Sequence, residues 1–353
     1  MTQFQQAIET AQPVAAVIIS VALMLFSGFL MTRITKLLRL PNVTAYIVAG
    51  ILIGPYCLDL VPQRIISGTD FLSDIALAFI AFSTGEFFKL SVLKKSGMKV
   101  VWITLFEAVL ASVFVFVLTY FVFRLELAFS IVLAALASAT APASTMMTIR
   151  QTGAKGDFVD TLLQVVALDD VVGLVLYSVA ISVALASLGG SRGFSFETLV
   201  KPVLLNLAAL ALGGLFGLVM KLLMPARRST DNKLIISVAL LFAFCGVCTL
   251  LDVSPLLGCM AMGTVYTNVA ENDKLFKQLG YFSPPILLLF FVRSGMNFKL
   301  DALFSASGSL NGVPLIAVGV GYFLVRIAGK YAGAWFGLSL IHISEPTRHL
   351  RIS

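Results

Sequence analysis

The chain has 353 residues, of which 59% are hydrophobic and 12% are charged, and its mean hydropathy is +0.98. This composition excludes a soluble globular domain and predicts an all-α polytopic membrane protein. The formal net charge is +7. It does not indicate nucleic-acid binding, because no basic cluster is interleaved with aromatic residues. In a membrane protein, such an excess of Lys and Arg usually marks the cytoplasmic loops.

Eleven apolar stretches alternate with polar loops along the chain. They cover residues 14–31, 42–56, 70–88, 99–123, 126–149, 158–185, 199–223, 233–251, 254–270, 282–298 and 313–337. A helix that crosses a bilayer needs about 20 apolar residues, and most of these stretches approach or exceed that length. The second is short and ends in Gly54-Pro55, so its depth in the membrane is left open.

The loops predict the orientation of the chain. If the N-terminus lies outside, alternate loops are cytoplasmic and hold fifteen basic residues, against five on the other side. The fifteen are Arg33, Lys36, Arg39, Lys89, Lys94, Lys95, Lys99, Arg150, Lys155, Lys221, Arg227, Arg228, Lys233, Lys274 and Lys277. This asymmetry favours a multi-pass protein of the cell (inner or plasma) membrane with its N-terminus outside.

The fifth span contains a run of small residues around a proline, Ala137-Ser138-Ala139-Thr140-Ala141-Pro142-Ala143-Ser144-Thr145. Pro142 has no N–H, and its ring clashes with the carbonyl of the fourth residue before it, so a helix breaks or kinks there. A broken membrane helix leaves carbonyls unpaired, which is tolerated where they line a cavity and can hold an ion. A simple proline kink with small packing residues is the alternative.

The sixth span has two adjacent carboxylates, Asp169 and Asp170, near its middle. One Asp at the bilayer centre costs about 2.5–3.5 kcal/mol, so the pair requires partners or a water-filled cavity. An acid at this depth indicates an ion or proton pathway. A further acid, Glu107 in the fourth span, is interpreted as a structural partner of Arg293 or Lys330 rather than as a proton relay.

Two segments of the chain resemble each other at an offset of 210 residues. Gly85 and Phe88-Lys89-Leu90 match Gly295 and Phe298-Lys299-Leu300. The third and tenth spans that contain these segments run in opposite directions under the orientation above. The match therefore fits an inverted-topology repeat, which is common in secondary transporters.

Residues 338–353 are expected to be a non-native tail. The run Leu338–Arg348, LSLIHISEPTR, resembles the in-frame translation of a sequencing adapter. Residues 1–337 would then be a transmembrane cation/proton exchanger domain that is incomplete at its C-terminus. Both histidines of the chain, His342 and His349, lie in the tail, so no histidine-based metal site or proton relay is expected in residues 1–337.

An N-out chain with Gly54-Pro55 early, a small-residue broken helix and Asp169-Asp170 in the next span resembles the monovalent cation:proton antiporter-2 family, over nearly all of residues 10–337. The closest likeness within it is to bacterial sodium/proton antiporters with paired aspartates. The resemblance implies an inverted-repeat fold of thirteen helices with two crossing discontinuous helices, of which this chain holds about eleven. It also implies a homodimer and no cofactor.

The resemblance implies the following site. Asp170 carries the transported Na⁺ or K⁺ and the proton, and Asp169 pairs with a basic residue, for which Arg326 is the match. Thr140 is the polar residue of the broken helix formed at Ala141-Pro142. Hard oxygen ligands from the two carboxylates, the Thr140 hydroxyl and the freed carbonyls would hold the metal cation.

Two alternatives to a cation/proton antiporter are compatible with the sequence. One is a potassium efflux system whose C-terminal regulatory domain has been lost. The other is a non-transporting membrane sensor on the same fold, against which the buried charges argue, because a sensor does not need them. The sequence does not distinguish Na⁺ from K⁺ or give a stoichiometry.

The repeat offset predicts that the native gene continues beyond this chain. Adding 210 to the fifth and sixth spans places their counterparts near residues 336–359 and 368–395, so the gene should encode at least ~60 more residues, beginning with a second interrupted span. Reading the genomic DNA past the codon for Gly337 tests this. DNA that encodes Leu338 to Ser353 and then stops would contradict both the tail and the missing helices.

Overall fold

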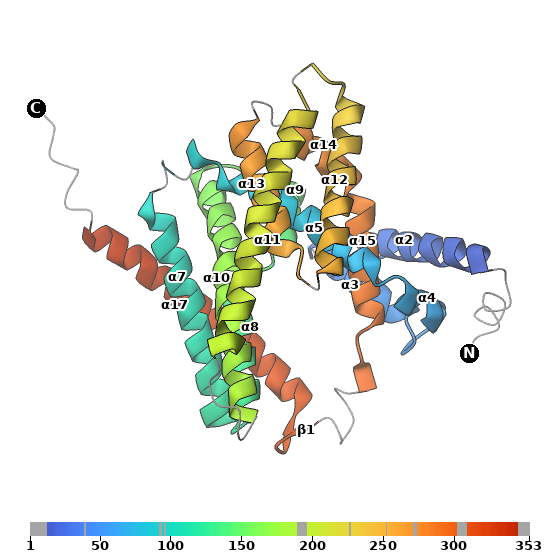
Figure 1. The fold of residues 1–353 in the computed structure, drawn as a ribbon. Coiled ribbons are helices and arrows are strands. Elements are labelled where there is room, and N and C mark those ends of the chain that lie inside the picture. The colour runs from blue at the N-terminus through green and yellow to red at the C-terminus, as the bar shows by residue number, and fades with distance from the viewer. Residues whose placement is uncertain are drawn as a thin grey trace, which may run out of the picture. The chain divides into compact units, whose positions relative to one another are not determined.

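The computed structural model describes residues 13–38, 40–91, 94, 97–188, 196–225, 227–251, 253–270, 274–301 and 309–344. These residues are almost entirely helical (Figure 1). The described strands are β1 (Ser309–Leu310) and β2 (Val313–Pro314), which pair as an antiparallel hairpin with Leu310 opposite Val313. The remainder of the predicted tail, residues 345–353, lies outside the described residues.

The described residues separate into two compact units. Unit 1 comprises residues 1–86, 143–154 and 208–300, and unit 2 comprises residues 87–142, 155–207 and 301–353. Unit 1 contains α2 (Pro13–Leu37), α3 (Asn42–Ile53), α4 (Gln63–Gly68), α5 (Phe71–Thr84), most of α9 (Pro142–Thr152), the C-terminal part of α11 (Phe196–Leu223), α12 (Thr230–Leu250), α13 (Leu256–Val269), α14 (Lys274–Phe282) and α15 (Pro284–Met296). Unit 2 contains α7 (Met98–Phe116), the π-helix η2 (Val117–Val122), α8 (Leu127–Ser138), α10 (Asp157–Leu188) and α17 (Leu315–Ser344). The short 3-10 helix η1 (Gly85–Phe88) lies at the border.

Each predicted span corresponds to helix in the structure. Among the described residues, seven helices are long and apolar enough to cross a membrane, or eight if the bent pair α14 and α15 counts as one span. The shorter apolar helices α3, α8 and α13 fall in the predicted spans 42–56, 126–149 and 254–270. The all-α polytopic prediction is therefore confirmed, and the fifth span is divided between two helices.

Unit 1 is held together where small residues bring helices close. Gly50 on α3 faces the backbone of Val292 and Gly295 on α15, and Gly263 on α13 faces the backbone of Phe82 on α5. A side chain at either glycine would collide with a neighbouring backbone, so these crossings require glycine. In the same unit, the buried Arg293 bonds to Asp70, Ser73 and the carbonyl of Ile66. These contacts give Arg293 a structural role within unit 1.

Unit 2 is built around the contact between α7 and α17, which α8 and α10 extend. Three glycines spaced by four residues, Gly329, Gly333 and Gly337, lie along one face of α17 against α7. A Cβ at Gly329 would come within 2.8 Å of the Ala111 Cα, and one at Gly333 would meet the backbone of Phe106 and Glu107. This glycine stripe brings the two backbones into contact at the height of Glu107.

We predict that Gly333→Val destabilises the protein, because the added side chain must push α17 away from α7. Overpacking of this kind typically costs about 1–3 kcal/mol. Gly319→Val on the same helix is the matched control, since a Cβ there has no atom within 4 Å. The melting temperature of the purified protein in detergent should fall more for Gly333→Val than for Gly319→Val, and equal melting temperatures would contradict the close packing.

Candidate functional site

The candidate site lies at the break in the fifth span. Helix α8 ends at Ser138 and α9 begins at Pro142, with Ala139 in an extended conformation, φ −76° and ψ 145°. Proline is well suited to the first position of a helix, where no N–H is needed. The end of α8 therefore leaves its last carbonyls without partners inside the helix.

Basic side chains from α17 donate hydrogen bonds to these carbonyls. Arg326 Nε donates to the Ala137 carbonyl at 3.1 Å, and its Nη2 donates to the Ala139 carbonyl. Lys330 Nζ donates to the Ser138 carbonyl at 2.8 Å. Positive charge at a helix C-terminus is favourable because it opposes the helix dipole. The freed carbonyls were expected to ligate the cation; in the structure those of residues 137–139 accept hydrogen bonds from Arg326 and Lys330.

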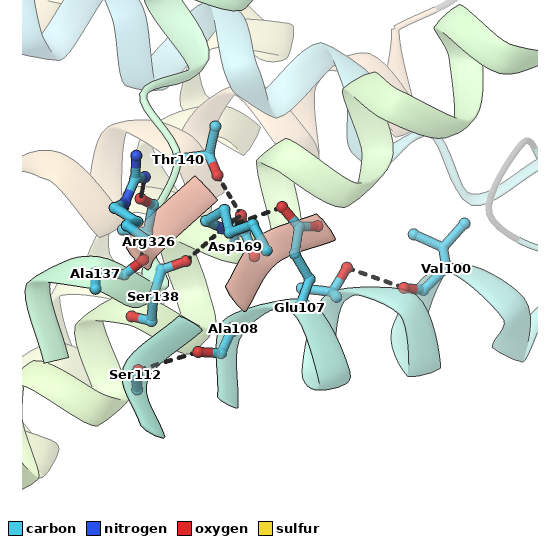
Figure 2. A network of polar contacts seen from close by, with 12 residues as sticks. Val100, Glu107, Ala108, Ser112, Ala137, Ser138, Thr140, Asp169 and Arg326 are labelled. Atoms are coloured by element: carbon cyan, nitrogen blue, oxygen red, sulfur yellow. Dashed lines mark hydrogen bonds and ion pairs between the residues drawn. The ribbon is translucent and has the colours of Figure 1, made fainter. Parts of the chain in front are cut away.

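Asp169 lies at the centre of the site. Its side chain is 0% exposed, and its Oδ2 accepts hydrogen bonds from Thr140 Oγ1 at 2.6 Å and from Lys330 Nζ at 2.8 Å. Figure 2 shows Thr140 pointing onto Asp169 from the break, with Glu107 reaching toward the same point from α7. The structure thus brings together Thr140 and Asp169, which the sequence analysis placed in one site.

The other oxygen of the same carboxylate has no partner. Asp169 Oδ1 is buried and makes no hydrogen bond within the part of the chain that the structure describes. A buried carboxylate oxygen without a partner is costly. This oxygen can therefore accept a proton or bind a cation.

The predicted charge partner of Asp169 was wrong. The ion pair comes from Lys330 rather than from Arg326, which bonds to the α8 carbonyls instead. The two basic residues are four positions apart and hence lie on the same face of α17. The packing of α17 places Lys330, rather than Arg326, opposite Asp169.

Glu107 completes the group of charges. Lys330 Nζ forms a second ion pair with Glu107 Oε1 at 3.1 Å, and the two side chains are 13% and 15% exposed. The interpretation of Glu107 as a partner of Lys330 is confirmed. Lys330 itself was not predicted as a site residue, although the glycines on either side of it, Gly329 and Gly333, signal that this part of α17 packs closely.

Asp170 occupies a different environment from its neighbour. It is half-buried, and the described residues offer it no hydrogen bond or ion pair. Adjacent helical residues point about 100° apart, so Asp170 is turned away from the direction in which Asp169 meets Lys330. Ala141 is exposed beside Thr140 and contributes no acid, and Pro142 serves to start α9. The site therefore offers one ion-paired carboxylate and one without a partner.

Comparison with known proteins identifies the kind of molecule that carries this site. Residues 19–350 match the family model described as "Sodium/hydrogen exchanger, transmembrane". The chain belongs to this family of sodium/hydrogen exchangers. The exchanger is accordingly a transporter rather than an enzyme, and its family supports multi-pass insertion in a membrane. No curated protein matches the chain.

Solved structures show the same fold. The sodium proton antiporter MjNhaP1 from Methanocaldococcus jannaschii at pH 8 is 19% identical, with a TM-score of 0.69 over 96% of the exchanger and 81% of that chain. A 3D EM map of MjNhaP1 gives 19% identity and a TM-score of 0.71 over 95% and 80% of the two chains. At this identity the likeness establishes the antiporter fold alone.

We predict that Asp169 is coupled energetically to Lys330 and not to Arg326. Lys330→Met should cost about 3–5 kcal/mol of stability, because it leaves a buried carboxylate uncompensated. Adding Asp169→Asn should recover part of that loss, whereas Arg326→Met and Asp169→Asn should add. Melting temperatures arranged as double-mutant cycles measure both couplings. A larger coupling for Asp169 with Arg326 than with Lys330 would contradict the geometry.

Proposed function

We propose that the exchanger moves a monovalent cation, Na⁺ or K⁺, against protons by binding either one at the Asp169–Asp170 pair. The observation that carries this proposal is the buried Asp169 carboxylate, which has one oxygen ion-paired to Lys330 and one without a partner. The neighbouring Asp170 supplies a second carboxylate. Membership of the sodium/hydrogen exchanger family supports the two cargoes.

The chemistry requires one site that accepts either cargo. A proton or a bare alkali cation can neutralise a carboxylate, and hard oxygen ligands suit Na⁺ and K⁺. Asp170, Asp169 Oδ1 and the Thr140 hydroxyl are the oxygens that this site offers. A site that holds one cargo at a time and opens alternately to each side exchanges the two ions if it changes sides only when it is loaded.

The gradients available are sufficient to drive such exchange. One pH unit supplies about 1.4 kcal/mol per proton, and 100 mV supplies about 2.3 kcal/mol per net charge moved. Either gradient can therefore drive the other ion, in a direction set by the stoichiometry.

The basic residues of the loops support the placement of the exchanger. We propose that it lies in the cell membrane with its N-terminus outside, since fifteen basic residues fall on one side and five on the other. The antiporter-2 likeness, the homodimer and the division into an exchanger domain of residues 1–337 and a tail of residues 338–353 remain proposals of the same kind. Each is open to test by sequencing, cross-linking or topology mapping.

We predict that Asp170→Asn abolishes cation-dependent proton flux and leaves the protein folded. The change keeps the size of the side chain and removes the charge that must bind the cargo. Proton flux should be measured by fluorescence dequenching in proteoliposomes, with protein expressed from its genomic reading frame and with Na⁺, K⁺ and Li⁺ added in turn.

The matched control is Asp160→Asn, in the first turn of the same helix α10. Removal of this acid should leave exchange at the wild-type rate. Wild-type exchange by Asp170→Asn would contradict the proposed role of the pair. Wild-type protein that folds but exchanges none of the three cations would instead support the non-transporting alternative.

A further inference from the structure

The ammonium group of Lys330 is shared between two carboxylates. It lies 2.8 Å from Asp169 Oδ2 on α10 and 3.1 Å from Glu107 Oε1 on α7, and its third bond, at 2.8 Å, goes to the Ser138 carbonyl. An ammonium group has three donors, so all of them are used. Two of the three bonds are ion pairs with acids from different helices.

The two acids differ in what surrounds them. Asp169 stands beside the break and Asp170, where the cargo is proposed to bind, and has an oxygen without a partner. Glu107 comes from α7 rather than from the broken helix or α10, and Lys330 is the one basic residue to which the described residues pair it. The cargo thus competes with Lys330 for Asp169 but not for Glu107.

Glu107 is also fixed in place by the backbone beneath it. Its Cα and N lie against Gly333 on α17, so close that no side chain would fit at position 333. Gly333 and Lys330 belong to adjacent turns of the same helix. The backbone positions from which Glu107 and Lys330 extend are therefore held together by direct contact between α7 and α17.

These charges must rebalance when a cation arrives. If a cation on Oδ1 neutralises the Asp169 carboxylate, the ammonium on Oδ2 loses the charge that it pairs with inside an apolar helix bundle, and an unpaired buried charge is strongly unfavourable. An ammonium that already has a second carboxylate keeps a partner. The free energy needed to displace the ammonium from Asp169, which cation binding must supply, is therefore smaller than it would be without Glu107.

We propose that Glu107 is a positioning residue that receives the Lys330 ammonium when the cargo cation displaces it from Asp169, and that Glu107 thereby raises the affinity of the site for the cation. This inference rests on the proposed function. It adds to that function a residue outside the broken helix and outside the aspartate pair. Glu107 touches the ammonium and not the cargo, so it acts through Lys330.

The test compares cation affinity in Glu107→Gln with affinity in the wild type. Without the second carboxylate, Lys330 pairs with Asp169 alone and the cation competes less well. The KM for Na⁺ in the proteoliposome assay should rise at least tenfold, while kcat changes less than twofold. Glu107→Asp, which restores the charge, should recover at least part of the KM. The control is Glu126→Gln, an exposed acid at the start of α8, which should leave both constants unchanged.

A second measurement separates this role from simple loss of stability. The rise in melting temperature with Na⁺ concentration gives the cation affinity of purified protein without transport. Glu107→Gln should shift that concentration dependence at least tenfold in the wild-type background. It should shift it less than twofold when Lys330→Met is already present, because no ammonium remains to be positioned.

The outcomes are distinguishable from failure of the proposed function. Unchanged KM and unchanged Na⁺ dependence of melting in Glu107→Gln, alongside normal wild-type exchange, would overturn the inference and leave the function standing. The same shift with and without Lys330→Met would also overturn it, because the effect would not pass through the ammonium. Absence of exchange and of stabilisation in the wild type with both Na⁺ and K⁺ would instead contradict the proposed function. If Glu107→Gln alone does not fold, Glu107→Asp is compared with the wild type, and the double variant Glu107→Gln, Lys330→Met is compared with Lys330→Met.

Discussion

The arrangement of unit 2 depends on compensating one fully buried carboxylate. Asp169 is in the middle of an apolar helix of 32 residues, where an unpaired charge is unfavourable by several kcal/mol. Its ion pair with Lys330 and its hydrogen bond with Thr140 draw on α17 and on the break after α8. The same ammonium group and Arg326 cap the carbonyls at that break. One group of charges therefore stabilises the acid and the interrupted helix together.

The close packing of α7 on α17 makes this grouping possible. Gly329, Gly333 and Gly337 leave no side chain between the two helices, and this brings Glu107 within reach of Lys330. A membrane helix gains no hydrophobic advantage from packing on another helix, so small residues and polar contacts determine where helices meet. In unit 2 the close glycine contacts and the ion pairs lie at the same height, because both involve residues 329–333 of α17.

Much of this fold could be predicted from the sequence because its signals are local. Long apolar runs predicted the helices, and Pro142 among small residues predicted the break. The family resemblance also placed Thr140 in one site with Asp169. The resemblance selected Arg326 as the partner of Asp169, whereas the structure pairs Asp169 with Lys330. The two basic residues are one turn apart on the same face of α17 and separated by about 6 Å along its axis. That choice depends on how α17 is placed against α7 and α10, which no local pattern encodes. For the same reason, the binding of the α8 carbonyls by basic side chains was not foreseen.

The proposed exchange depends on competition between a proton and an alkali cation for the aspartate pair. The most direct measurement is calorimetric titration of Na⁺ into the purified wild-type exchanger at a series of pH values, with the number of protons released per bound cation determined from buffers of different ionisation enthalpy. If the two ions compete, Na⁺ should bind more weakly as the pH falls, protons should be released on binding, and both effects should vanish in Asp170→Asn. Na⁺ binding with the same affinity at every pH and without proton release would contradict this competition.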